Sequence, residues 1–264
     1  MQWQEQSGPG RGVRLHVRRV VDPPAPPVLL LHGLGVGGSV FQAFARRLLP
    51  HLGAVAPDLR GHGQSDAPPS GYSPADYALD IAELIQDGFG APVPVVGNSL
   101  GALVGLELGD LRPELVSWLV LLDPPLDPEL RNSEVESVFR LRKAPPGELE
   151  AYLLERNPGG GKLLADNLAS LFRQASDAAF EAMLTGRGFD APAVSHPTLI
   201  LQADPRKGGV LGDAAAREFA DRLPKGRLVK IAGGSHALHA SHPAEVARAI
   251  LEFGGYSSDG GSSR

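Results

Sequence analysis

Residues 93–108, VPVVGNSLGALVGLEL, decide the fold of this chain. The apolar run that opens the stretch predicts a short buried strand, and the apolar spacing after Ala102 predicts a helix. Between them stands Gly97-Asn98-Ser99-Leu100-Gly101, a serine flanked two residues away on each side by glycine. A sharp strand-to-helix turn of this kind exposes the serine hydroxyl beside the unpaired N–H groups of the helix N-terminus. We therefore expect Ser99 to be a nucleophile.

The length and composition restrict the classes of protein to which the chain can belong. With 264 residues, it can form one substantial core with an inserted subdomain. Its net charge of −5 provides no basic surface for nucleic acid, and no apolar run approaches the roughly 20 residues of a membrane span. The first residues contain no apolar signal segment, so we expect a cytoplasmic location. The chain has no cysteine, and its composition leaves the oligomeric state open, a homodimer included.

The order of apolar patterns along the chain predicts a doubly wound α/β fold. Strand-like and helix-like patterns alternate, which favours a mostly parallel sheet with helices on both faces. Between residues 125 and 196 only helix-like patterns occur, so we expect a helical cap inserted there. The core is then formed by residues 1–124 and 197–256. The glycine- and serine-rich tail, residues 257–264, is predicted to be disordered.

A nucleophilic serine needs a base, and the histidines after Ser99 provide the candidates. His236 stands in a glycine-rich loop directly after the last predicted strand, at the sheet edge expected for Ser99. We therefore select His236 as the base, with His239 as second choice. The spacing of His236, His239 and His242 does not match H-E-x-x-H on one helix face, so we expect neither a metal site nor a cofactor.

Two aspartates are candidates for the acid that orients the base. Asp204 follows the predicted strand at 198–202 and precedes His236, which gives the order Ser, Asp, His. Asp123 ends the strand that follows the helix of Ser99 and is the alternative. We select Asp204 and keep Asp123 open.

The loop His32-Gly33-Leu34 follows a continuous apolar run and is expected to reach the same sheet edge. The backbone N–H of Leu34, with that of Leu100, would form an oxyanion hole. His32 is expected to brace this loop, and we place His32, Gly33 and Asn98 in the substrate pocket. Further along, Arg60 and Asp66 are expected to form an ion pair across a tight turn.

These pieces together resemble the α/β-hydrolase superfamily over about residues 13–254. The stretches that carry the resemblance are LLLHGLG at 29–35, DLRGHGQSD at 58–66, GNSLG at 97–101, TLILQ at 198–202 and GGSHALH at 233–239. The resemblance implies a Ser99, His236 and Asp204 triad with the Leu34 and Leu100 amides as donors. The turn at 97–101 carries serine, whereas the dehalogenase and epoxide-hydrolase branches of the superfamily carry aspartate at this position.

The resemblance implies hydrolysis of a carboxylic ester or lactone through an acyl-enzyme, with a small-molecule substrate. The same triad serves C–C bond hydrolysis, thioester cleavage and perhydrolysis of the haloperoxidase type, because the fold does not fix the substrate. A ligand-binding module that retains a hydrolase pocket is the alternative from another class. The apolar residues of the predicted cap, such as Phe139, Leu153, Leu163, Phe172 and Phe180, suit an apolar substrate group.

Overall fold

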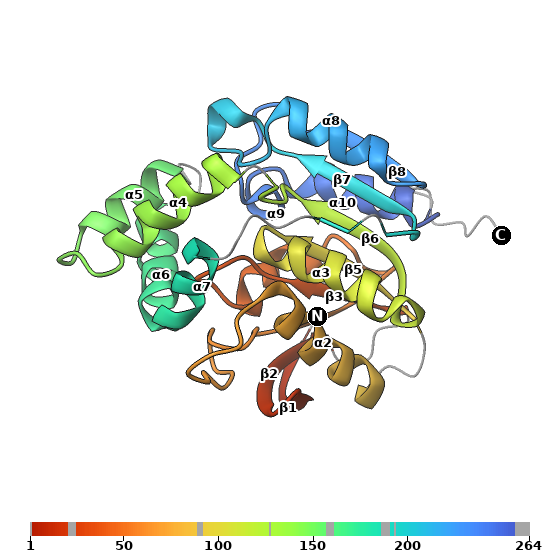
Figure 1. The fold of residues 1–264 in the computed structure, drawn as a ribbon, viewed down its shortest axis with the longest axis horizontal. Helices are drawn as coiled ribbons and strands as arrows, with labels where there is room; N and C mark the ends of the chain where they lie inside the picture. Colours follow the sequence, from red (N-terminus) through yellow and green to blue (C-terminus); the bar gives the residue numbers. More distant parts are fainter. Residues whose placement is uncertain are drawn as a thin grey trace.

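The computed structural model describes residues 2–20, 25–88, 92–126, 128–156, 161–185, 191–192 and 194–256, and the predicted disordered tail lies outside these ranges. Within them, one sheet of eight strands has the order β1-β2-β4-β3-β5-β6-β7-β8 (Figure 1). The strands are β1 (Trp3–Gly10), β2 (Val13–Val20), β3 (Pro27–Leu31), β4 (Gly53–Pro57), β5 (Val93–Asn98), β6 (Val116–Leu122), β7 (Thr198–Gln202) and β8 (Gly226–Lys230). Strand β2 pairs antiparallel with β1 and β4, and the remaining neighbours pair in parallel.

The central strands are apolar on both faces, because helices cover both sides of the sheet. In β3, Leu29 and Leu31 belong to one hydrophobic core, whereas Val28 and Leu30 belong to the other. The first core includes residues of α2 (Pro74–Gly88), α3 (Leu100–Leu111) and α8 (Asp213–Arg222). The second includes residues of α1 (Gln42–Ala45), α9 (Leu238–Ser241) and α10 (Pro243–Phe253). The predicted doubly wound α/β fold is confirmed.

Where the structure describes the chain between β6 and β7, it forms four helices, and we refer to them as the cap. They are α4 (Pro128–Leu141), α5 (Glu148–Arg156), α6 (Gly161–Gln174) and α7 (Asp177–Thr185). The cap stands to one side of the sheet, and β6 and β7 point toward it (Figure 1). The binding edge of an open α/β sheet is the edge where the parallel strands end, so the cap covers the place where a ligand is expected.

Arg142, which follows α4, joins three parts of the cap. Its guanidinium donates to the carbonyls of Phe172, Arg173 and Ala175 at the end of α6, and it pairs with Asp177 of α7 at 2.7 Å. The carbonyls at the end of a helix lack partners within that helix, so a buried cation satisfies them and the negative end of the helix dipole.

The loop after β4 is anchored differently from the sequence-based expectation. Arg60 pairs with Asp80 of α2 and not with Asp66, through Nε–Oδ2 and Nη2–Oδ1 distances of 2.6 and 2.5 Å. Asp80 is buried, whereas Asp66 lies near the surface and pairs with Arg14. The predicted Arg60–Asp66 pair is therefore wrong. The prediction paired residues within one loop, whereas the actual partner of Arg60 lies on α2.

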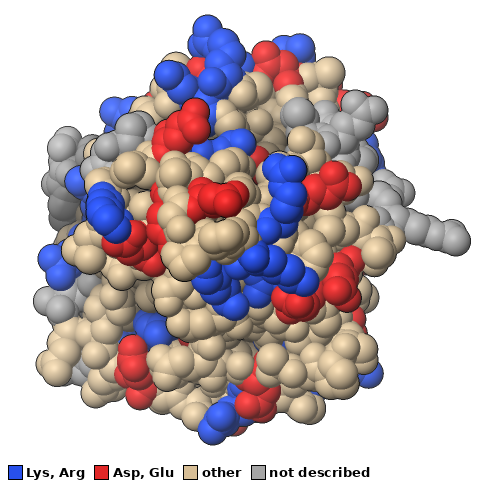
Figure 2. All heavy atoms as spheres, turned by 90° about the vertical axis from the view of Figure 1, so that its left-hand side faces the viewer, with Lys and Arg blue, Asp and Glu red and all other residues tan. Residues whose placement is uncertain are grey.

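The surface on the cap side of the molecule carries basic and acidic side chains mixed together (Figure 2). Within the described ranges, none of the helices is long and apolar enough to span a bilayer.

The tight turn around Ser99 predicts a large difference between two glycines of α3. A Cβ at Gly101 would collide with the backbone carbonyl of Leu31, whereas a Cβ at Gly105 would lie 3.5 Å from a methyl group of Val95, an ordinary contact. Gly101→Ala should lower the free energy of unfolding by about 1–3 kcal/mol, as other overpacked sites do. Gly105→Ala should stay within about 1 kcal/mol of the unmodified protein, since alanine also favours the helix. Urea denaturation of both variants measures the difference, and equal losses would contradict this account of the turn.

Candidate active site

Ser99 stands in a strained backbone conformation between β5 and α3. Its φ and ψ are 53° and −118°, a combination that residues other than glycine rarely adopt. The helix begins immediately, because the amides of Ala102 and Leu103 donate to the Ser99 carbonyl at 2.9 and 3.3 Å. Side chains at the flanking glycines would meet backbone atoms, so the turn has no room for them. This geometry holds the Ser99 side chain at the end of the sheet, where it lines a cavity.

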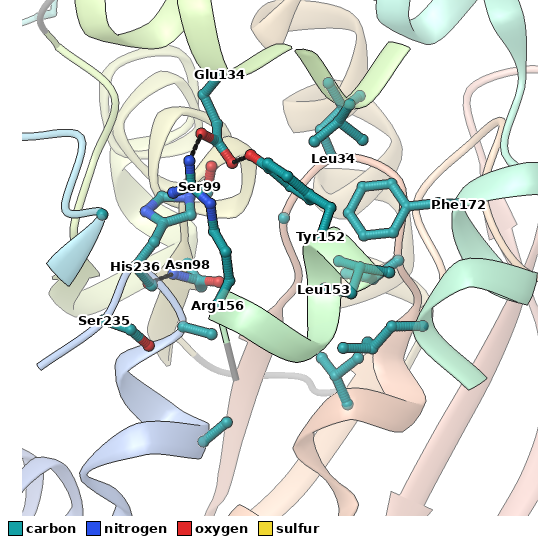
Figure 3. Close-up of a pocket in the computed structure, with 18 of the residues that line it drawn as sticks. Leu34, Asn98, Ser99, Glu134, Tyr152, Leu153, Arg156, Phe172, Ser235 and His236 are labelled. Carbon is teal, nitrogen blue, oxygen red and sulfur yellow. Dashed lines mark hydrogen bonds and ion pairs between the residues drawn. The ribbon is translucent and has the colours of Figure 1, made fainter. Parts of the chain in front are cut away.

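His236 lies on the loop that follows β8 and lines the same cavity as Ser99 (Figure 3). Its Nδ1 lies 2.7 Å from Oδ2 of Asp123, a carboxylate that is completely buried. An ionised carboxylate can only accept, so Nδ1 carries the proton and Nε2 keeps a free lone pair. In the neutral imidazole, this contact favours the Nδ1–H tautomer, which is the one that a general base needs.

Asp123 is held firmly in this position by the backbone of the neighbouring β7 region. The amides of Ala203 and Val210 donate to its two oxygens at 3.1 and 2.8 Å, and its own amide donates to Leu201 at 2.8 Å. Its φ of 47° turns the chain sharply as β6 ends. The carboxylate thus receives three hydrogen bonds, one of them from His236.

The sequence-based choice of Asp204 as the partner of His236 is contradicted by these contacts. Asp204 accepts from the Arg206 guanidinium, with distances of 3.0 Å from Nε and 2.8 Å from Nη2, and from the Arg206 amide at 3.0 Å. These hydrogen bonds lower the pKa of Asp204. Its second oxygen also accepts from the Gly233 amide at 3.3 Å. Asp204 therefore fastens the loop that carries His236, whereas Asp123, the open alternative, contacts the imidazole.

The two aspartates were hard to separate by sequence because β6 and β7 are parallel neighbours. Each aspartate directly follows the end of its strand or comes within two residues of it, so both reach the same edge of the sheet. The direction of each side chain depends on the turn after the strand. The Asp-Pro-Pro sequence at 123–125 shows a turn but not its handedness.

Asn98 connects the serine turn to the histidine loop. Its side-chain amide donates to the carbonyl of His236 and to that of Leu122, each at 3.1 Å. The residue was expected in the pocket and does line the cavity. Its main contacts, however, place it as a brace between Ser99 and His236, a role that the sequence analysis missed.

The expected oxyanion donors are the amide of Leu34, in the loop after β3, and that of Leu100, directly after Ser99. Neither the Leu34 amide nor the Leu100 amide donates a hydrogen bond within the part of the chain that the structure describes. Gly33 lies directly against Ser99, since a Cβ there would come within 3.3 Å of the Ser99 Cβ. Two free amides near a serine hydroxyl can stabilise negative charge on a carbonyl oxygen.

His32 fixes the direction of the peptide that carries the Leu34 amide. Its Nδ1 donates to the Gly33 carbonyl at 2.8 Å, and its Nε2 accepts from the Leu59 amide at 2.9 Å. Burial lowers the pKa of His32, so the ring stays neutral and can both donate and accept. The Gly33 carbonyl and the Leu34 N–H belong to one planar trans peptide and point in opposite directions. By holding the Gly33 carbonyl, His32 therefore also fixes the direction of the Leu34 N–H.

His239, the second choice for the base, also lines the cavity but has a different environment from His236. Its ring is buried against Phe41, with ring centroids 4.6 Å apart, and burial lowers its pKa to about 4. Within the described ranges, no three or more His, Asp or Glu side chains are grouped so that they could hold a metal ion.

The cavity has a volume of about 220 Å³ and lies between the serine turn and the cap. The cap wall is largely apolar and includes Val135, Val138, Leu153, Leu164, Leu168, Phe172 and Phe180. Of the cap residues named from the sequence, Leu163 is exposed instead, and Phe139 stacks on Phe180 at 5.6 Å. One polar group interrupts the apolar wall and consists of Glu134, Tyr152 and Arg156 (Figure 3).

Comparison with known proteins gives consistent results. A family model described as "Alpha/beta hydrolase family" matches residues 28–249. The chain is 32% identical to 2-(acetamidomethylene)succinate hydrolase of Mesorhizobium japonicum over 86% of this chain and 87% of that protein. A crystal structure of E-2-(acetamidomethylene)succinate hydrolase superposes with a TM-score of 0.79 at 26% identity, covering 96% of this chain and 99% of the other. The esterase EaEST from Exiguobacterium antarcticum has the same fold, with a TM-score of 0.80 at 21% identity over 95% and 99% of the two chains.

The Asp123–His236 contact predicts which substitution disturbs the imidazole. In Asp123→Asn, the side-chain amide can donate to Nδ1, so the proton should move to Nε2. In Asp204→Asn, the Nδ1–H tautomer should persist. The ¹⁵N chemical shifts of the His236 ring, recorded above its titration, distinguish the two tautomers. If Asp204→Asn changed the tautomer and Asp123→Asn did not, the assignment of the acid would be reversed.

Proposed function

Because the chain belongs to the alpha/beta hydrolase family, we propose that it cleaves carboxylic esters or lactones through an acyl-enzyme on Ser99. The observation that carries the proposal is the 2.7 Å contact between His236 and the buried Asp123, at a cavity that Ser99 also lines. A binding protein has no need of a serine on a strained turn, an imidazole oriented by a buried carboxylate and two free amides together.

In the first half of the reaction, His236 Nε2 takes the proton of the Ser99 hydroxyl as its oxygen attacks the substrate carbonyl. The Leu34 and Leu100 amides hold the negative oxygen of the tetrahedral intermediate. The intermediate collapses as the C–O bond to the alcohol breaks, and His236 gives its proton to the leaving alkoxide.

The second half returns the enzyme to its starting state. Water attacks the acyl group on Ser99 while His236 takes its proton, and the proton then passes to the Ser99 oxygen as the acid leaves. Asp123 stays ionised throughout and stabilises the imidazolium that forms twice. The proposal uses no cofactor.

A second candidate is hydrolysis of a substrate other than an ester. The relative with 32% identity is named for a 2-(acetamidomethylene)succinate, whereas the esterase above shares the fold at 21% identity. The same groups act on thioesters, on C–C bonds beside a carbonyl and in perhydrolysis. Cytoplasmic location stays a prediction from the sequence, and the oligomeric state stays open.

Labelling with a fluorophosphonate tests the nucleophile. The unmodified protein should gain the mass of one adduct, and Ser99→Ala should gain none. Ser235→Ala is the matched control, because Ser235 lines the same cavity and its loss should leave the adduct in place. An adduct that disappears with Ser235 and persists without Ser99 would overturn the assignment.

Turnover of a panel of aryl esters tests the reaction itself. Ser99→Ala should lower kcat by about four or more orders of magnitude, because the acyl-enzyme can no longer form. Circular dichroism and thermal unfolding verify that the variant is folded. If the labelled protein turns over thioesters or amides but no ester, the second candidate replaces the first.

A further inference from the structure

We propose that Arg156, assisted by Lys207, binds a carboxylate of the substrate, so that the preferred substrates are esters that also carry an acidic group. This inference rests on the proposed function and adds the substrate class to it. It arises from the one polar group in the cap wall of the cavity, which hydrolysis of a wholly apolar ester would not need.

Arg156 reaches across the cavity from the cap to the core. It ends α5, and Figure 3 shows its side chain extending into the cavity that Ser99 and His236 line. Its Nη1 lies close to the loop after β7, since a Cβ at Gly208 would come within 2.6 Å of this nitrogen. Glycine at 208 therefore leaves space for the guanidinium.

The guanidinium is held in one orientation before any ligand binds. Its Nη2 pairs with Glu134 Oε2 at 2.9 Å, and the Tyr152 hydroxyl donates to the other Glu134 oxygen at 2.7 Å. The Arg156 guanidinium also lies over the Tyr152 ring, 4.8 Å from its centroid. A cation fixed in this way loses little conformational freedom when an anion binds.

Arg156 keeps donors for a ligand after these contacts are counted. A guanidinium has five N–H donors in a planar fork that matches a carboxylate. Within the described part of the chain, its polar partners are Glu134 and the Tyr152 hydroxyl, and these two cannot occupy all five donors. About a third of the side chain, 37%, is exposed, so the remaining donors can be reached.

Lys207 adds a second positive charge to the residues that line the cavity. It is exposed, lines the same cavity and precedes Gly208, the residue next to the Arg156 guanidinium. Within the described ranges Lys207 makes no ion pair, and Glu134 is the single carboxylate that lines the cavity. Two cations opposite one carboxylate leave one positive charge unbalanced, and an acidic substrate group would balance it.

The apolar part of the cavity wall restricts the part of the substrate that lies between its two polar ends. Leu164, Leu168 and Phe172 follow each other at intervals of four on α6 and form an apolar surface beside the polar group. A ligand that fits both surfaces has a hydrocarbon chain between the reacting carbonyl and the carboxylate.

Paired substrates test this proposal directly. Mono-p-nitrophenyl esters of dicarboxylic acids from adipate to suberate would be compared with p-nitrophenyl alkanoates of matched length, after subtraction of uncatalysed hydrolysis. The unmodified enzyme should show a higher kcat/KM for the anionic ester at one chain length or more. Arg156→Gln should lower the anionic-to-neutral ratio of kcat/KM about 10- to 100-fold, since a charged hydrogen bond is lost.

Arg140→Gln is the matched control, because Arg140 is an exposed arginine of the cap that does not line the cavity. It removes the same charge and should leave the ratio unchanged. Arg156→Lys should recover part of the preference, and Lys207→Gln should reduce it less than Arg156→Gln does. A ratio below one at every length, or an equal fall for both ester types in Arg156→Gln, would overturn the proposal.

A binding measurement separates failure of this inference from failure of the proposed function. In Ser99→Ala, monomethyl adipate should bind at least about tenfold more tightly than dimethyl adipate by calorimetry, and Ser99→Ala/Arg156→Gln should lose this preference. This binding preference can be observed even if no ester is turned over. In that case the carboxylate site would be supported, and the proposed reaction would have to be replaced. Equal binding of the two adipates would overturn the proposed carboxylate site. Ester turnover could still be observed in that case, so the proposed function would not be affected.

Discussion

The chain turns from strand to helix around Ser99 in a space that excludes any side chain at Gly97 or Gly101. This steric limit brings β5, α3 and the end of β3 into direct contact, and it leaves Ser99 with a positive φ. The rest of the site depends on it. Gly33 can lie against Ser99 only because the turn is this tight, and the free Leu34 and Leu100 amides come with it. The strained backbone at Ser99 therefore depends on the surrounding core, since only packed neighbours can hold a residue in such a conformation.

Around this turn, buried polar side chains fix the other groups at short range. Asp123 orients His236, Asn98 ties the histidine loop to the strands, and His32 aims the Leu34 peptide. Asp123 accepts three hydrogen bonds, both ring nitrogens of His32 are bonded, and the Asn98 amide donates two hydrogen bonds. Such networks favour one arrangement over others. Asp204 acts indirectly, because it accepts a hydrogen bond from the Gly233 backbone in the loop that holds His236.

The cap and the core make different contributions to the cavity. The core supplies Ser99, His236 and the loop of Leu34, all placed where the parallel strands end. The cap supplies most of the apolar wall and the Glu134, Tyr152 and Arg156 group. Because Arg156 reaches the loop at Gly208, a change in either part would alter the same binding surface.

The sequence by itself determined the features that depend on short stretches of chain. Alternating apolar patterns predicted the doubly wound sheet, and the glycine-flanked serine predicted the turn, because both arise from local backbone sterics and burial. Tertiary structure alone decided between Asp123 and Asp204, since both follow neighbouring parallel strands and only the turn at Asp123 directs a carboxylate toward His236. It also replaced the predicted Arg60–Asp66 pair by Arg60–Asp80 and brought Arg156 into the cavity. The direction of a side chain toward a distant partner is a long-range property, which neither spacing nor composition records.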